Sequence, residues 1–180
     1  MEINDRLELA RYFNLLGFEK GAEIGVSCGN YSKKLCEQIL GLKLYCIDIW
    51  QTYVGNKRSP NNERQENHYK EAKEKLKPYN VFFMRMMSMD AVKLFADESL
   101  DFVFIDANHD YQYVLDDITE WSKKVRSGGI VSGHDYYKFR GSGVIEAVTK
   151  YLSDKPKIRL HITTKHRKPA ESHCFWWVKP

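Results

Sequence analysis

The sequence has no uninterrupted apolar run close to the roughly 20 residues that a membrane-spanning helix needs, so we exclude a membrane protein. Its first residues, MEINDRLELARYF, carry acids and no continuous apolar core, and we expect no signal peptide. The four cysteines form no C-x-x-C pair, which favours reduced thiols of a cytoplasmic protein over a zinc site or disulfides. The formal net charge of +4 is small and spread along the chain, so we do not expect a nucleic-acid partner.

What the chain does contain is typical of one globular domain. With 180 residues, 43% of them hydrophobic and 29% charged, it can bury a full core. Neither a linker nor an internal repeat divides it, so we predict a single domain over residues 1–180. Apolar residues recur every three or four positions over Glu2–Leu16. This spacing predicts a helix, capped by Gly17, that packs on the domain within residues 1–20.

Short apolar runs alternate with amphipathic segments along most of the chain. Five runs are each followed by a helical pattern, and two further runs near the end have no helix between them. We therefore predict an α/β fold: a Rossmann-like, seven-stranded, mostly parallel sheet with helices on both faces and a C-terminal antiparallel hairpin strand. A tight turn is expected at Arg126–Gly129. The predicted strands are Ala22–Val26, Lys43–Ile49, Val81–Met86, Leu100–Ile105, Ile130–Gly133, Ile158–Thr163 and Cys174–Val178.

The stretch AEIGVSCGNYS, Ala22–Ser32, combines a strand, a glycine loop and a helix start. In this arrangement backbone N–H groups and a helix N-terminus meet a ligand, although two glycines can also form a plain structural turn. The dinucleotide pattern G-x-G-x-x-G starting at Gly25 fails twice, because Ser27 and Asn30 stand where glycines are needed. A nicotinamide enzyme is therefore a remote alternative.

Two later positions could complete a nucleoside site. Asp48 ends the second predicted strand 19 residues after Gly29, close to where an acid accepts hydrogen bonds from a ribose diol. The alternative is a strand-end Asp that caps the next turn. Ser88 and Met89 follow the third strand, where an apolar side chain and backbone groups could grip an adenine ring. The alternative there is a core methionine beside an ordinary helix cap.

Acid and histidine pairs follow two further strands. Asp106 and His109 come after Leu100–Ile105, and His134 and Asp135 come after Ile130–Gly133. Because ligands of open α/β sheets bind outside the carboxyl strand ends, we expect these side chains to meet in one crevice. A histidine there has a reference pKa suited to a general base, whereas either one alone could be a hydrogen-bonded structural imidazole.

The stretch FVFIDANHDYQYVLDDITEWSKKVRSGGIVSGHDY resembles the signature region of a class I S-adenosylmethionine (SAM) methyltransferase family. That family reads I-D-G-x-H-x-Y, then an acid-rich helix with Trp, then G-G-x-x-x-G-H-D, and includes O-methyltransferases that tailor antibiotics and their sugars. The glycine loop also resembles its first motif, acid-x-Gly-x-Gly-x-Gly, with Ser27 in place of the middle glycine. One departure is Ala107-Asn108, where the family usually shows a glycine and an acid.

The resemblance implies a role for each matching residue. The glycine loop would hold the methionine part of SAM, Asp48 the ribose, and Ser88 with Met89 the adenine. The implied catalytic residues are His109 and His134; the implied cofactor-binding residues are Glu23, Gly25, Ser27, Gly29, Asp48, Ser88, Met89 and Asp106. In metal-using relatives the positions of Asp106, His134 and Asp135 bind Mg²⁺. Histidine is a poorer Mg²⁺ ligand than a carboxylate, so the metal stays open.

We therefore expect a SAM-dependent methyltransferase acting on a hydroxyl of a small molecule or sugar. The alternative is a catalytically silent SAM- or nucleotide-binding domain that serves as a binding or structural subunit. An RNA substrate has only the basic stretch Lys165–Lys168 in its favour. The acceptor pocket is expected from Trp50–Asn62, a possible lid, with Tyr136–Gly143 and Lys165–Ser172. A homodimer is also left open.

Overall fold

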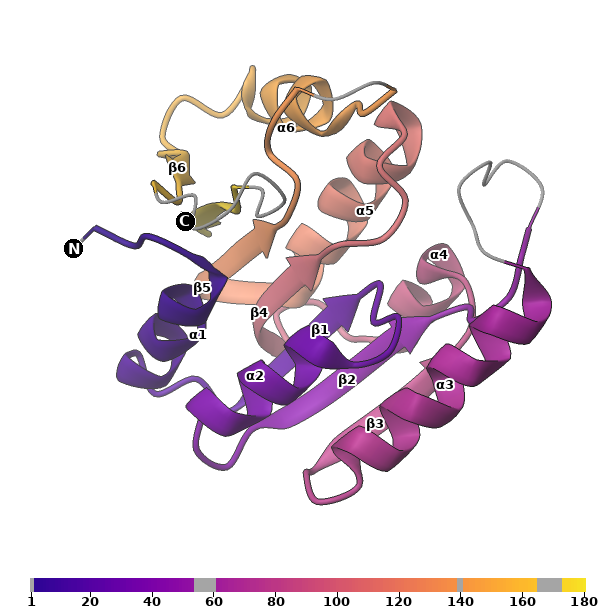
Figure 1. Ribbon diagram of the computed structural model, residues 1–180. Helices are drawn as coiled ribbons and strands as arrows, with labels where there is room; N and C mark the ends of the chain where they lie inside the picture. Colours follow the sequence, from indigo (N-terminus) through magenta and orange to yellow (C-terminus); the bar gives the residue numbers. More distant parts are fainter. Residues whose placement is uncertain (1, 54–60, 139–140, 165–172) are drawn as a thin grey trace.

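The computed structural model describes residues 2–53, 61–138, 141–164 and 173–180, and its strands form one seven-stranded sheet (Figure 1). The strand order is β3-β2-β1-β4-β5-β7-β6. The strands are β1 (Lys20–Ile24), β2 (Lys43–Asp48), β3 (Val81–Arg85), β4 (Leu100–Ile105), β5 (Val125–Gly133), β6 (His161–Ile162) and β7 (Phe175–Val178). The helices are α1 (Arg6–Leu15), α2 (Asn30–Gln38), α3 (Asn62–Leu76), α4 (Ser88–Ala91) with the 3₁₀ turn η1 (Val92–Leu94), α5 (Tyr111–Lys124) and α6 (Val144–Leu152).

The pairing of the strands confirms the predicted fold class. Strands β1 to β5 pair in parallel, and β7 lies antiparallel between β5 and β6. The order of the strands reverses between β1 and β4, because β2 and β3 extend to one side and β5 to the other. Such a reversal opens a crevice at the carboxyl ends of the strands, where α/β proteins bind ligands.

Helices cover both faces of the sheet (Figure 1), and alternate strand residues face them. In β4, Phe102 and Phe104 belong to the core beneath α1, α2 and α3, whereas Val103 and Ile105 belong to the core beneath α4, α5 and α6. Phe13 of α1 stacks on Phe102 with ring centroids 4.5 Å apart. None of the described helices is long and apolar enough to cross a bilayer.

Several element boundaries differ from the sequence prediction; strand β1, for example, runs over Lys20–Ile24 instead of Ala22–Val26. Helix α1 begins at Arg6, because the side chain of Asp5 accepts hydrogen bonds from the backbone N–H groups of Leu7 and Glu8. Strand β5 already starts at Val125, and the expected tight turn is instead an irregularity within it: Leu100 pairs with Val125 but Phe102 pairs with Ile130. The penultimate strand is reduced to His161–Ile162.

Candidate functional site

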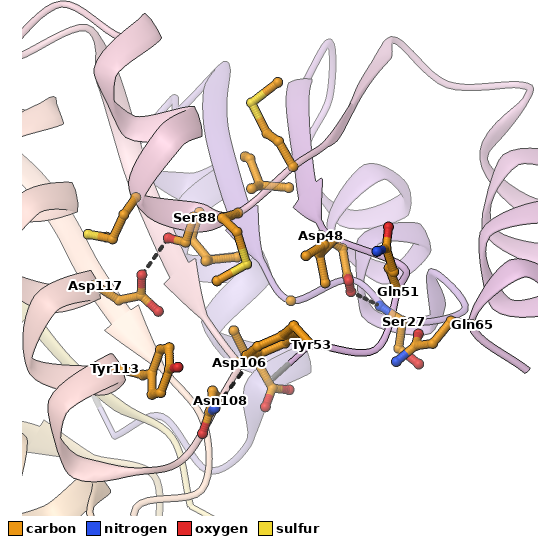
Figure 2. Close-up of a pocket in the computed structure, with 18 of the residues that line it drawn as sticks. Ser27, Asp48, Gln51, Tyr53, Gln65, Ser88, Asp106, Asn108, Tyr113 and Asp117 are labelled. Carbon is orange, nitrogen blue, oxygen red and sulfur yellow. Dashed lines mark hydrogen bonds between the residues drawn. The ribbon is translucent and has the colours of Figure 1, made fainter. Parts of the chain in front are cut away.

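A cavity of about 350 Å³ lies at the carboxyl ends of β1, β2 and β4 (Figure 2). Six of the residues predicted to bind a cofactor line it: Gly25, Ser27, Asp48, Ser88, Met89 and Asp106. Of its other described lining residues, Gln51 and Tyr53 belong to the predicted acceptor segment Trp50–Asn62. The rest were not singled out from the sequence as ligand contacts: Ile24, Ile47, Ile49, Gln65, His68, Met86, Met87, Ala107, Asn108, Tyr113, Asp116 and Asp117. Separate stretches of the chain therefore converge on one hollow, as the strand ends predicted.

The glycine loop forms one wall of this cavity. Gly25 has a φ of +91°, and a Cβ there would lie 2.2 Å from the carbonyl oxygen of Asp106, so only glycine lets β1 and β4 approach this closely. Ser27 adopts the left-handed region at φ +51° although it has a side chain. Its carbonyl accepts a hydrogen bond of 2.7 Å from the indole Nε1 of Trp50, which helps to hold this conformation.

Gly29 fits a structural role more directly than a ligand contact. It precedes α2 with a φ of +75°, and a Cβ at this position would meet Leu76 and Ala72 of α3 at 3.2–3.3 Å. Among the described residues, it is absent from the cavity lining. Gly29 therefore lets α2 and α3 pack together, and its predicted contact with a cofactor stays a prediction.

Asp48 connects the end of β2 to the glycine loop. One carboxylate oxygen accepts hydrogen bonds from the backbone N–H groups of Val26 and Ser27, both at 2.9 Å. The other oxygen accepts one from the N–H of Trp50, also at 2.9 Å. Asp48 thus shapes the loop and lines the cavity at once, and the carboxylate is positioned before any ligand binds.

Glu23 lies behind the loop, outside the set of described residues that line the cavity. Only 2% of its surface is exposed, and the hydroxyl of Ser32 on α2 donates a hydrogen bond to its carboxyl group. Burial raises the pKa of Glu23 to about 8, although this hydrogen bond acts in the opposite direction. Its predicted contact with the methionine part of SAM stays a prediction, because the structure shows it joining β1 to α2.

The apolar end of the cavity contains a polar network that the sequence analysis missed. Trp121 donates a 2.8 Å hydrogen bond from its indole to the hydroxyl of Ser88, and Ser88 is hydrogen-bonded to Asp117. Asp117 is only 4% exposed, and burial raises its pKa to about 7. An acid between Val114 and Ile118 on the buried face of α5 was the signal that could have found it.

The two acid and histidine pairs meet beside the cavity. His109 Nε2 lies 2.7 Å from a carboxylate oxygen of Asp135 and 3.5 Å from one of Asp106. His134 Nδ1 lies 3.2 Å from Asp135 and 3.6 Å from Asp106. Asp106 also lines the cavity, so it connects this four-residue group, which we call the Asp/His cluster, to the place where a ligand would lie.

The charges within the cluster change the proton affinity of the His109 imidazole. Burial by itself would lower the pKa of His109, but the hydrogen bonds and negative charges of Asp106 and Asp135 outweigh it and raise the pKa to about 9. Asp135 adopts a left-handed φ of +57°, an unusual conformation for a residue with a side chain. The backbone thus turns sharply after β5 and directs this carboxylate back toward β4.

A second group of side chains lies across the mouth of the cavity (Figure 2). The amide Nδ2 of Asn108 donates a 3.0 Å hydrogen bond to the hydroxyl of Tyr53, whose ring lies 6.2 Å from that of Tyr113. Tyr53 belongs to the segment predicted as a lid, of which residues 54–60 lie outside the described part of the chain. The other two predicted acceptor segments are likewise described only in part (136–143) or not at all (165–172).

Comparison with known families identifies a methyltransferase domain in this chain. A family described as a methyltransferase domain matches residues 22–136, which run from the start of the glycine loop to the end of the Asp/His cluster. A search of curated protein sequences finds no significant match.

Solved structures match over nearly the whole chain. An O-methyltransferase from Bacillus cereus in complex with S-adenosylhomocysteine (SAH) has a TM-score of 0.73 at 16% identity, covering 97% of this chain and 80% of that chain. The O-methyltransferase TomG from Streptomyces achromogenes, involved in tomaymycin synthesis and in complex with SAM, has a TM-score of 0.73 at 16% identity, with coverages of 97% and 79%. A putative rRNA methylase from Clostridium thermocellum has a TM-score of 0.69 at 14% identity and covers 100% of both chains. At these identities the likeness shows the fold alone.

Proposed function

Since the chain belongs to this methyltransferase-domain family, we propose that it transfers the methyl group of SAM to a hydroxyl group of a small molecule or sugar. One observation carries the proposal: Asp106 lines the cavity and also contacts both histidines of the Asp/His cluster. Asp106 therefore belongs both to the cavity proposed to bind the cofactor and to the cluster whose histidines can accept a proton. The complexes of two structural neighbours with SAH and SAM support the choice of cofactor.

In this proposal the cofactor lies along the carboxyl ends of β1, β2 and β4. The carboxylate of Asp48 accepts hydrogen bonds from the ribose hydroxyls, as an acid at the end of the second strand commonly does. Because Gly25 has no side chain and packs closely on Asp106, its backbone lines the cavity and can contact the methionine part of the cofactor. The sulfonium end then points toward the Asp/His cluster.

Methyl transfer to an alcohol is an in-line displacement that depends mainly on alignment. The acceptor oxygen forms a bond to the methyl carbon while the bond between carbon and sulfur breaks, and SAH leaves as the product. The hydroxyl proton passes to a base, for which His109 and His134 are the candidates, since a positioned imidazole is a common general base. With its pKa raised to about 9, His109 accepts the proton only in its neutral form, whose share grows as the pH rises toward 9. Asp106 and Asp135 hold both imidazoles in place.

The donor atoms of Asp106, His134 and Asp135 lie within 4.8 Å of one another, a spacing that fits a divalent cation. Two carboxylates suit Mg²⁺, which prefers oxygen ligands, whereas the imidazole nitrogen suits Mn²⁺ or Zn²⁺ better. A bound cation would supply Lewis-acid chemistry that lowers the pKa of the acceptor hydroxyl. We therefore keep Mg²⁺ in the proposal. We also keep a cytoplasmic location and a homodimer as separate parts of it.

A transfer assay tests the proposal. Purified protein is incubated with SAM labelled in its methyl group and a panel of phenols, sugars and an RNA pool, with and without Mg²⁺ or Mn²⁺. We expect label in a hydroxylated small molecule and a loss of transfer in His109→Gln and His134→Gln. Label in RNA alone would overturn the choice of acceptor, and cofactor binding without any transfer would favour a silent binding domain.

A further inference from the structure

Asp117 is a buried acid in the cavity to which the proposed reaction gives no role. It lies on α5, its residue is 4% exposed, and it lines the cavity together with Ser88. Within the described part of the chain, its side chain has one hydrogen-bond partner, Ser88. Burying a carboxyl group is costly unless it serves the fold or a ligand, so this position needs an explanation.

The direction of the hydrogen bonds around Ser88 determines which oxygen of Asp117 is available. The indole N–H of Trp121 can only donate, so the hydroxyl oxygen of Ser88 must accept from it. The single proton of Ser88 is then left to donate to Asp117 Oδ1. Ser88 has no proton left for a ligand, and Figure 2 shows the second oxygen of Asp117 turned away from Ser88.

The surroundings of Asp117 suit the flat base of a nucleoside. Met86, Met87, Met89 and Ile47 line the same cavity and present apolar surface and polarisable sulfur. This wall borders the ribose position directly, because the N–H of Met86 donates to the carbonyl of Asp48. If the ribose lies at Asp48 and the methionine part of the cofactor points to Asp106, the adenine base must occupy the part of the cavity that the methionines line.

We propose that Asp117 recognises the 6-amino group of adenine, with its second carboxylate oxygen accepting a hydrogen bond from that amine. This inference rests on the proposed function, since it assumes an adenosyl cofactor. A purine with an oxygen at position 6 would place an acceptor against an acceptor. The cavity should therefore prefer an adenine nucleoside to its hypoxanthine counterpart, and Ser88 acts by orienting Asp117, not by touching the base.

Calorimetric titration of the full chain with SAH and with S-inosylhomocysteine tests this at pH 8.5, where the carboxyl group of Asp117, whose pKa is about 7, is ionised. We expect the wild type to bind SAH about 10- to 100-fold more tightly, the range for one hydrogen bond to a charged group. Asp117→Asn should reverse much of this ratio, because the amide keeps an oxygen for Ser88 and presents its NH₂ group to the base. Asp90→Asn is the matched control, since Asp90 lies two positions after Ser88 but pairs with Lys93 at the surface and is not among the described residues that line the cavity. This control should keep the wild-type ratio.

The outcomes separate this inference from the proposed function. Equal affinity of the wild type for both nucleosides would overturn the role of Asp117 and leave the methyltransferase intact. An unchanged ratio in a folded Asp117→Asn protein would also overturn it. If wild type binds no SAH, both ideas fail together. The wild-type ratio needs no substitution, so the inference can still be refuted if the variant does not fold.

Discussion

The buried acid of β1 gives the sharpest test of the structure, through the pH dependence of stability. In the folded protein burial raises the pKa of Glu23 to about 8, against 4.5 in the unfolded chain. Since the folded pKa is raised, the contribution of Glu23 to the free energy of unfolding is fully present below pH 4.5. It is lost as the pH rises through about 8. The expected loss is about 3 kcal/mol at pH 7 and about 5 kcal/mol well above pH 8.

Replacing Glu23 by Gln removes this titration and keeps an oxygen that can accept the hydrogen bond of Ser32. We therefore expect the free energy of unfolding of Glu23→Gln, relative to wild type, to increase by about 3 kcal/mol between pH 4 and pH 7. Urea denaturation of both proteins at several pH values measures this difference, and any constant effect of the substitution cancels. The matched control is Glu37→Gln on the exposed side of α2, which should show no such trend.

A pH-independent difference between Glu23→Gln and wild type would refute the reasoning. It would mean that the carboxyl group of Glu23 ionises without penalty, and so reaches water or a cation. The acid would then be free to contact a ligand, as the family resemblance implies, and its burial behind the glycine loop would be wrong.

Three further substitutions test the site itself. Gly25→Ala should cost about 2–4 kcal/mol in urea denaturation, because its φ is +91° and its Cβ would lie 2.2 Å from the Asp106 carbonyl; a stable variant would contradict the close approach. Asp48→Asn should weaken SAH binding about 10- to 100-fold in calorimetry, since it loses the negative charge and turns an NH₂ group toward backbone donors. His109→Gln should lower single-turnover methyl transfer about 100-fold or more at unchanged SAH affinity; full activity would leave His134 as the base.

Much of the fold could be predicted because its signals are local. The run Leu100–Ile105, apolar except for Asp101, is typical of a central strand with both faces buried, and Phe102 to Ile105 alternate between the two cores. The family match likewise confirms the methyltransferase resemblance, although the I-D-x-x-H-x-Y and G-H-D-Y signature itself is not tested. The start of β5 was missed because Gly128 and Gly129 look like a turn locally, whereas the pairing of Val125 with Leu100 depends on distant residues.

The site was predicted where it depends on strand ends and missed where it depends on packing. Asp106, His134 and Asp135 come together because their strands are neighbours in the sheet. Asp117 escaped notice because its partner lies 29 positions away on another helix. The location of Glu23 follows from strand alternation: Ala22 and Ile24 face one core, so the side chain between them turns to the other.

The central claim is that this cavity seats an adenosyl cofactor with its ribose on Asp48, and a crystal structure with SAH tests it most directly. We predict density along the carboxyl ends of β1, β2 and β4, with the ribose hydroxyls within hydrogen-bond distance of the Asp48 carboxylate. The sulfur should lie toward Asp106 and the base toward Asp117. Density for SAH elsewhere on the protein, or a ribose remote from Asp48, would contradict the account.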